Sequence, residues 1–282
     1  MKTFPEGRLS VGVLASVLFL CLSSFSRADS LAPLSTQEAR LVGTGELEVL
    51  LGFAYARDVG FPGFSRSAES LLSAPRLGFS VGLGKRVEIQ AGYELRRVED
   101  VTGANDETSY GSGDATLATK VLVWNESSVR PAFGLRAETK LPNADDRKGL
   151  GTDETDFLFD ALLSRDFGPV RLHGNAGLHI LGNPRPEGGQ DDLFAYSLAL
   201  LGPSLPVRRA GLRPALELRG LEGSRFGNDL LGGTLALRFE IGRTVVFTGV
   251  GVGFSGAAED WSVSAGVVRK IDLAELFAKE PR

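Results

Sequence analysis

Apolar and polar residues alternate along a series of short stretches in this chain. In the clearest one, Leu135 and Ala137 share one parity, and Arg136, Glu138 and Lys140 share the other. Successive residues of a β-strand point to opposite faces of a sheet, so this stretch predicts a strand with one apolar and one charged face. The same pattern predicts about twelve strands, at residues 46–55, 77–83, 87–95, four between 110 and 181, 193–201, 212–218, 231–241, 245–254 and 261–268.

The connections between these strands alternate in length. Long connections are expected at residues 57–74, 99–112, 143–153, 182–191, 221–229 and 255–260, and shorter ones at 84–86, 125–128, 166–169, 202–211 and 242–243. Barrels of bacterial outer membranes have short periplasmic turns and longer extracellular loops. The chain is therefore predicted to be all-β, an antiparallel up-and-down transmembrane β-barrel at residues 45–270 whose two ends lie in the periplasm. Residues 271–282 are expected to form a C-terminal tail that begins with a helical turn.

Two short motifs carry a resemblance to a known family. Gly-Ser-Gly-Asp at residues 111–114 opens one strand, and Thr-Lys-Leu-Pro at residues 139–142 precedes a loop rich in Asp and Gly. The chain resembles, over residues 45–270, a family of bacterial outer-membrane β-barrels that is associated with the meta-pathway of phenol degradation and also labelled as transporters. The family pattern often continues Pro-Thr-Gly-Asp, whereas Asn143, Ala144 and Asp145 follow here. The resemblance implies an outer-membrane barrel that could pass small hydrophobic or aromatic compounds.

The N-terminus reads as a secretory signal. Residues 1–8 carry Lys2 and Arg8, residues 9–25 are mostly apolar, and small residues, Ser26 and Ala28, stand at positions −3 and −1 of a cleavage site after Ala28. A membrane-anchor helix is the weaker alternative, because the apolar core is short and a cleavage site follows it. We therefore expect a cleaved signal peptide at residues 1–28 and a periplasmic lead at residues 29–44. Cleavage also removes the one cysteine, Cys21, so the mature chain needs no disulfide.

Composition changes this interpretation little. The chain has 282 residues, 23% of them charged, and a net charge of −4. Its mean hydropathy is +0.02. No internal run approaches the roughly 18 apolar residues of a membrane helix, a test that barrels escape because only alternate residues face lipid. Signal cleavage lowers basic residues from 31 to 28 and acidic ones from 35 to 34, which gives −6. That balance argues against nucleic acid as a partner. The expected partners are outer-membrane lipid, the barrel-assembly machinery and a small solute.

No catalytic motif or cofactor-binding motif is present, so we expect neither an enzyme nor a cofactor. His173 and His179 share the inward parity, but six residues of strand separate them by about 20 Å, too far to hold one metal ion. The inward parity predicts a set of candidate lumen-lining residues of mixed charge: Glu88, Glu94, Arg96, Asp114, Lys120, Arg136, Glu138, Lys140, Asp156, Asp160, Arg171, His173, His179, Glu217, Arg219, Arg238 and Glu240. Opposite charges on neighbouring strands stabilise one another, so these residues either close the bore or line a narrow path.

Three functions remain open. A channel or transporter is favoured by the family resemblance. A structural or adhesion barrel would bind partners through its loops at residues 57–74 and 182–191. A barrel lipid hydrolase would need a Ser, a His and an acid at the lipid boundary, whereas both histidines are expected to point inward. On the outward face, aromatic residues are expected to contact lipid or form girdles: Tyr55, Tyr93, Trp124, Phe133, Phe157, Phe159 and Trp261.

Overall fold

The computed structural model describes residues 31–60, 67–100, 107–182, 189–224 and 229–277. Its strands are β1 (Glu46–Gly60), β2 (Ser67–Leu83), β3 (Val87–Asp100), β4 (Glu107–Ser112), β5 (Ala115–Trp124), β6 (Ala132–Leu141), β7 (Asp156–Phe167), β8 (Val170–Gly182), β9 (Gln190–Leu201), β10 (Leu205–Val207), β11 (Ala210–Glu222), β12 (Leu230–Ile241), β13 (Thr244–Gly253) and β14 (Trp261–Asp272). A 3-10 helix (Asp146–Lys148) lies between β6 and β7, and α2 (Leu273–Phe277) follows β14. No helix in the described part of the chain is long and apolar enough to cross a membrane.

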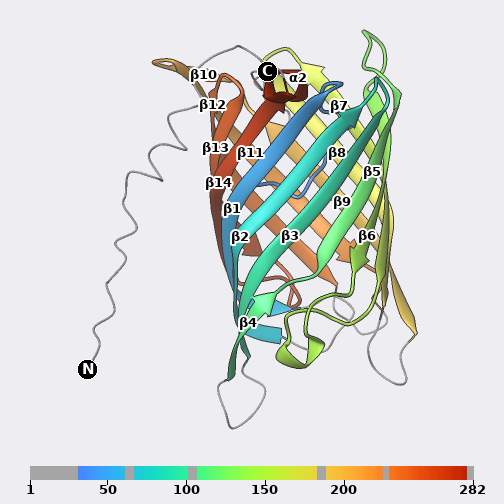
Figure 1. The fold of residues 1–282 in the computed structure, drawn as a ribbon, viewed down its shortest axis with the longest axis vertical. Coiled ribbons are helices and arrows are strands. Elements are labelled where there is room, and N and C mark those ends of the chain that lie inside the picture. Colours follow the sequence, from blue (N-terminus) through green and yellow to red (C-terminus); the bar gives the residue numbers. More distant parts are fainter. Residues whose placement is uncertain (1–30, 61–66, 101–106, 183–188, 225–228, 278–282) are drawn as a thin grey trace.

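The strands form one closed antiparallel barrel (Figure 1). Consecutive strands pair with each other, and β1 pairs with β14 from Glu46↔Asp272 to Arg57↔Trp261, which closes the sheet. The fourteen segments amount to twelve barrel strands. β4 and β5 pair with successive parts of β3, and β9 and β10 pair with successive parts of β11. The predicted all-β, up-and-down barrel of about twelve strands is confirmed.

The strands extend further than the alternation predicted at the long-loop end. The β1–β2 hairpin is paired up to Gly60↔Ser67, so much of the expected loop at residues 57–74 is strand. Likewise β3 and β4 are paired up to Asp100↔Glu107, inside the expected loop at residues 99–112. Strand also enters the expected loops at residues 182–191 and 221–229, and β10 lies inside the expected turn at residues 202–211. Beyond the lipid both faces of a hairpin meet water, so backbone pairing continues where the apolar alternation has ended.

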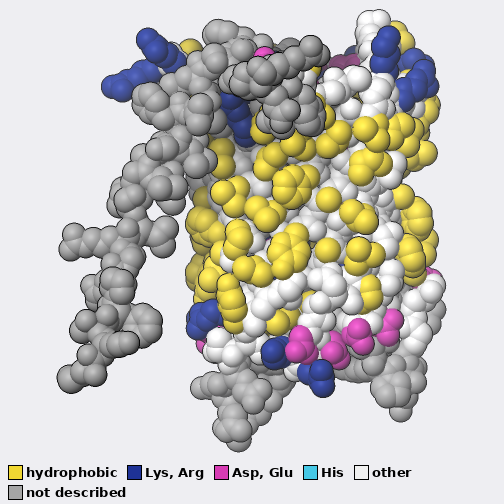
Figure 2. All heavy atoms as spheres, in the orientation of Figure 1, with side chains coloured by type: hydrophobic (Ala, Val, Ile, Leu, Met, Phe, Trp, Pro, Cys, Tyr) yellow, Lys and Arg dark blue, Asp and Glu magenta, His cyan; other side chains and the backbone are white. Residues whose placement is uncertain are grey.

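The outer surface carries a broad apolar band. Figure 2 shows apolar side chains around the middle of the visible face and charged side chains gathered at its two ends. Trp124 packs on Phe133 with ring centroids 4.7 Å apart at the short-turn end, and Tyr55 packs on Trp261 at 5.4 Å at the other end. These pairs occupy the positions of the aromatic girdles that flank a transmembrane barrel's apolar band. The exposed apolar residues of the band include Leu51, Phe53, Phe79, Leu117, Leu135, Phe159, Leu163, Leu198, Leu216, Leu235 and Val250.

Residues 31–44 lie inside the barrel, and we call them the inner segment. This differs from the expected lead in the periplasm. Figure 1 shows the segment, in blue, within the strands just before β1. Thr36 and Ala39 are almost fully buried, and a bridge from Thr44 to Gly82 joins the segment to the wall near the start of β1. This placement could not be predicted from the sequence, because the segment has no regular alternation and makes its contacts through isolated residues.

Candidate functional site in the barrel lumen

Polar side chains from three strands of the wall, β3, β7 and β8, hold one half of the inner segment. The backbone N–H of Val42 donates to Glu88 of β3 at 2.7 Å, and that of Ala39 donates to Ser164 of β7 at 2.9 Å. Gln37 exchanges two hydrogen bonds with Asn175 of β8, at 2.6 and 2.8 Å. Each contact satisfies a backbone group that has no sheet partner, which is the condition for irregular chain inside a barrel. The segment therefore follows the inner wall from β3 to β8.

Glu217 of β11 makes the most concentrated contact with the segment. Its carboxylate accepts the Thr36 N–H and the Thr36 hydroxyl, both at 2.6 Å, and the Ser35 hydroxyl at 3.0 Å. The Glu217 side chain is 2% exposed. A buried carboxylate needs such donors to offset its lost hydration. Glu217 thus fixes the middle of the segment against the wall.

Apolar contacts hold the far end of the segment. Leu31 and Leu34 pack into a cluster with small and branched residues of β9, β11 and β12. Ala32 packs with Val245, Phe247 and Val268, and its carbonyl accepts a hydrogen bond from Arg238 at 2.9 Å. The side chain of Pro33 comes within 2.8 Å of where a Cβ at Gly249 would stand, so glycine is required there. These contacts carry the segment round to β12, β13 and β14.

Arg40 joins the segment to two turns at the short-turn end. Its guanidinium lies 2.7 Å from Glu38 and 3.0 Å from Asp166, and it also bonds Glu126. Burial acts to lower the pKa of Arg40, but Glu38 and Asp166 outweigh burial and hold that pKa above its ordinary value. The group is therefore a permanent cation. It ties the segment to the β5–β6 connection and to the end of β7.

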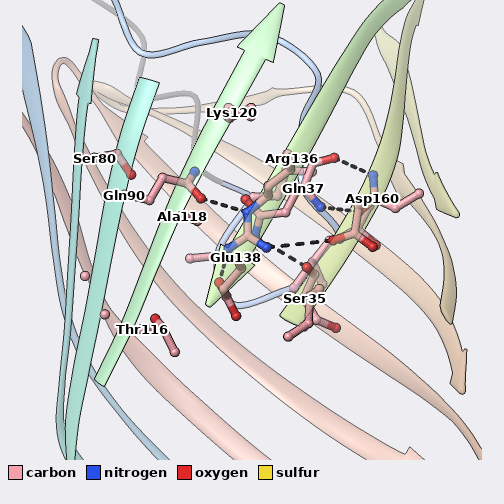
Figure 3. Close-up of a pocket in the computed structure, with 18 of the residues that line it drawn as sticks. Ser35, Gln37, Ser80, Gln90, Thr116, Ala118, Lys120, Arg136, Glu138 and Asp160 are labelled. Carbon is pink, nitrogen blue, oxygen red and sulfur yellow. Dashed lines mark hydrogen bonds and ion pairs between the residues drawn. The ribbon is translucent and has the colours of Figure 1, made fainter. Parts of the chain in front are cut away.

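Figure 3 shows the charged wall opposite the inner segment. Arg136 of β6 is at its centre and donates to Gln90 at 2.8 Å, bonds Glu138, and lies 3.8 Å from Asp160. Asp160 also meets His179 at 3.1 Å. The contacts join residues from β3, β6, β7 and β8 across the lumen wall. The structure therefore brings four of the candidates, Arg136, Glu138, Asp160 and His179, into one connected group.

A second charged group lies nearer the long loops. Lys140 meets Asp156 at 2.6 Å and Asp114 at 3.7 Å, and donates to Thr152 at 2.5 Å. Asp114 in turn accepts backbone N–H groups of the β6–β7 connection, including that of Ala144 at 3.0 Å. The connection between β6 and β7 is thereby tied to the inner wall.

The remaining candidates meet other partners around the lumen wall. Glu88 meets Lys120 at 3.1 Å, Glu94 meets Arg96 at 2.6 Å, Arg219 meets Glu259 at 2.5 Å, and Arg213 meets Glu240 at 2.9 Å. Arg171 lies 3.7 Å from Asp166, and His173 bonds Ser164 at 2.8 Å. The two histidines thus have different partners. In the described part of the chain, no group of three or more His, Cys, Asp or Glu residues is placed to hold a metal ion.

A cavity of about 600 Å³ lies between the inner segment and the strands. Eleven of the seventeen candidates line it, whereas Asp156, Arg171, His173, Glu217, Arg238 and Glu240 do not. Sequence reasoning missed several lining residues. Gln90 and Arg76 lie on the inward parity and could have been included, and Arg76 meets Glu94 at 3.2 Å. The inner-segment residues, Arg40 among them, do not lie in an alternating stretch, so parity could not place them in the lumen.

Comparison with known proteins supports the same architecture. A family model described as "Putative MetA-pathway of phenol degradation" matches residues 33–271. The COG4313 outer membrane channel from Pseudomonas putida F1 is 13% identical, with 84% of this chain and 100% of that chain covered and a TM-score of 0.59. The NanC porin is 11% identical, with 80% and 100% covered and a TM-score of 0.50. At these identities the likeness shows the fold alone. No curated protein matches the chain in sequence.

Proposed function

Since the chain belongs to the family described as "Putative MetA-pathway of phenol degradation", as its resemblance predicted, we propose that it is an outer-membrane channel for small compounds, hydrophobic or aromatic ones among them. We expect no catalysis and no cofactor. The proposal also includes export by a signal peptide cleaved after Ala28. The mature chain would then begin two residues before the inner segment.

The observation that carries the proposal is the cavity inside the barrel. Its volume of about 600 Å³ falls within the range of small-molecule sites, about 300–1,000 Å³. Apolar residues such as Leu158 and Leu230 share its lining with the Arg136 group. A compound with an apolar body and a few polar atoms suits such a lining. A large hydrophilic solute does not, because the inner segment occupies part of the lumen.

The inner segment acts in this proposal as a fixed constriction. Its backbone bonds and its buried residues tie it to strands all round the barrel, so passage runs between the segment and the charged wall. The channel is therefore narrow. Its interior charges are paired with both signs interleaved, so we expect weak selectivity between anions and cations.

The test compares the same substitution on the two faces of β5. Thr116 lines the cavity, whereas Thr119 is exposed on the outer face. The mature protein and its Thr116→Trp and Thr119→Trp variants are refolded into planar bilayers for single-channel recording and into vesicles for uptake of phenol. We expect several-fold lower conductance and uptake for Thr116→Trp, and little change for Thr119→Trp. Correctly folded wild-type protein that passes neither ions nor phenol would overturn the proposal and favour a structural or adhesion barrel.

A further inference from the structure

The turns at the short-turn end carry exposed basic side chains. These are Lys85 and Arg86 between β2 and β3, Arg130 between β5 and β6, and Arg208 and Arg209 between β10 and β11. No carboxylate in the described ranges lies within ion-pair distance of any of these five. We call them the basic rim. Other cations at this end differ, since Arg165 lies 3.7 Å from Glu126 and Arg243 lies 3.9 Å from Glu275.

Each described cation at the long-loop end has a carboxylate within ion-pair distance. Arg57 pairs with Glu69 at 2.8 Å and Arg97 with Glu99 at 2.5 Å. The same holds for Arg147 and Lys148, which both pair with Asp145. Among the residues that the structure describes, the two ends of the barrel therefore differ in the availability of positive charge. Within the described ranges, exposed basic groups that lack a carboxylate in reach lie at the short-turn end.

The basic rim directly borders the apolar band. Leu83 and Val207 are exposed apolar residues within two positions of Lys85 and Arg208. The Arg130 guanidinium lies 5.4 Å from the ring centre of Trp124, which faces outward at the edge of the band. Strand residues rise about 3.3 Å each, so these charges lie within roughly 10 Å of the band's edge. The headgroup layer of a bilayer occupies the first several ångströms beyond the hydrocarbon core.

We propose that the basic rim binds the anionic headgroups of phospholipids in the periplasmic leaflet of the outer membrane. Long basic side chains can lay their apolar stems along the band and present their charges to phosphate oxygens. Clustered Lys and Arg at a membrane surface recognise anionic lipid in this way. Charge complementarity and contact with the lipid-facing band favour a lipid over a soluble partner. The inference requires that the barrel spans a membrane with its short turns in the periplasm, and it does not depend on channel activity.

The chain offers an internal reporter at each end. It contains two tryptophans, Trp124 at the basic rim and Trp261 at the long-loop end, and they are similarly exposed, 37% and 40%. Trp261→Phe leaves Trp124 as the sole reporter, and Trp124→Phe leaves Trp261. Each variant is refolded into phosphatidylcholine vesicles that contain increasing fractions of brominated phosphatidylglycerol or, separately, brominated phosphatidylcholine. Bromine quenches tryptophan only on close approach, so the ratio of the two quenching curves gives the relative association of anionic lipid at that end.

We expect phosphatidylglycerol to be favoured at Trp124 by about fivefold or more, the effect of at least one engaged cation, and by little or nothing at Trp261. High salt should reduce the preference. Replacing all five basic-rim residues by Gln in the Trp261→Phe background should bring the ratio at Trp124 to unity, while Arg57→Gln with Arg97→Gln should leave it unchanged. Equal quenching by both lipids at Trp124 would overturn the proposal. A preference for phosphatidylglycerol that persists after all five basic-rim residues are replaced by Gln would also overturn it. A soluble acidic partner alone would also give no lipid preference in this assay.

Discussion

Glu217→Ala should release the inner segment from the wall without unfolding the barrel. Glu217 accepts three hydrogen bonds from Ser35 and Thr36, at 2.6, 2.6 and 3.0 Å. Hydrogen bonds to a charged group contribute about 1.5–3 kcal/mol each, and they are not additive. Losing them should weaken docking of the segment by about 3 kcal/mol. Since about 1.4 kcal/mol is a factor of ten, the undocked population should rise roughly a hundredfold. The strand pairs of β11 do not involve this side chain and should persist.

A buried thiol measures that population directly. Ala39 is 0% exposed and belongs to the inner segment, and the one native cysteine lies in the expected signal peptide. The cysteine introduced by Ala39→Cys should react slowly with a maleimide in the folded mature barrel and about one to two orders of magnitude faster when Glu217→Ala is added. Single-channel conductance should rise in parallel.

The matched control is Glu222→Ala, on the same strand. Glu222 bonds Tyr196 at 2.7 Å near the outer surface and does not touch the inner segment. This variant should leave both the labelling rate and the conductance unchanged. If the cysteine introduced by Ala39→Cys is labelled at the same rate with Glu217→Ala as with Glu222→Ala, the hydrogen bonds to Glu217 do not hold the segment against the wall.

Three further predictions concern the barrel and its orientation. Leu135→Arg should reduce the free energy of unfolding by about 2–4 kcal/mol because Leu135 faces lipid, whereas Arg136→Ala should fold and alter conductance. Refolding titrations measure the first effect and single-channel currents the second, and reversed effects would contradict the assignment of the two faces. An epitope inserted at residues 145–148 should be accessible on intact cells, whereas one at residues 242–243 should not, and opposite antibody binding would invert the topology. The mature protein should begin at or near Asp29 and migrate in a heat-modifiable form in the outer-membrane fraction. N-terminal sequencing of the fractionated protein checks both points, and recovery in the soluble periplasm contradicts them.

Much of the fold was predictable because lipid imposes a strict period of two on a barrel strand. The alternation around Leu135 and Arg136 identified β6, and its pairing with β7 brings Arg136 opposite Asp160. The strand count followed from repeating that pattern. Strand ends were less predictable at residues 57–74, because a hairpin that projects into water keeps its backbone pairing without an apolar face. Hydrogen-bonded register, as at Gly60↔Ser67, is a property of two strands and cannot be derived from one strand's pattern.

The candidate site was only half predictable, for a different reason. Parity alone places a side chain in the lumen, as it does for Glu217 on β11, but does not identify its partner there. The partner of Glu217 is Thr36, which is 181 residues away in the chain and belongs to a segment that contains no helix or strand. The position of such a segment is set by hydrogen bonds to the buried carboxylate and amide groups of the wall, and these bonds are known only once the fold is known.

The Lys and Arg side chains of this barrel have two different roles, and the presence or absence of a carboxylate partner distinguishes them. Arg136, Arg96 and Lys140 lie inside the barrel and each meets a carboxylate, so they fill and shape the lumen while adding little net charge to it. Arg130 and Lys85 are of the same residue types as these interior cations, but no carboxylate in the described ranges lies within reach of either. An exposed cation that borders an apolar band lowers its free energy most by meeting an external phosphate. Identical residue types therefore narrow the bore where they are paired and contact the membrane surface where they are not.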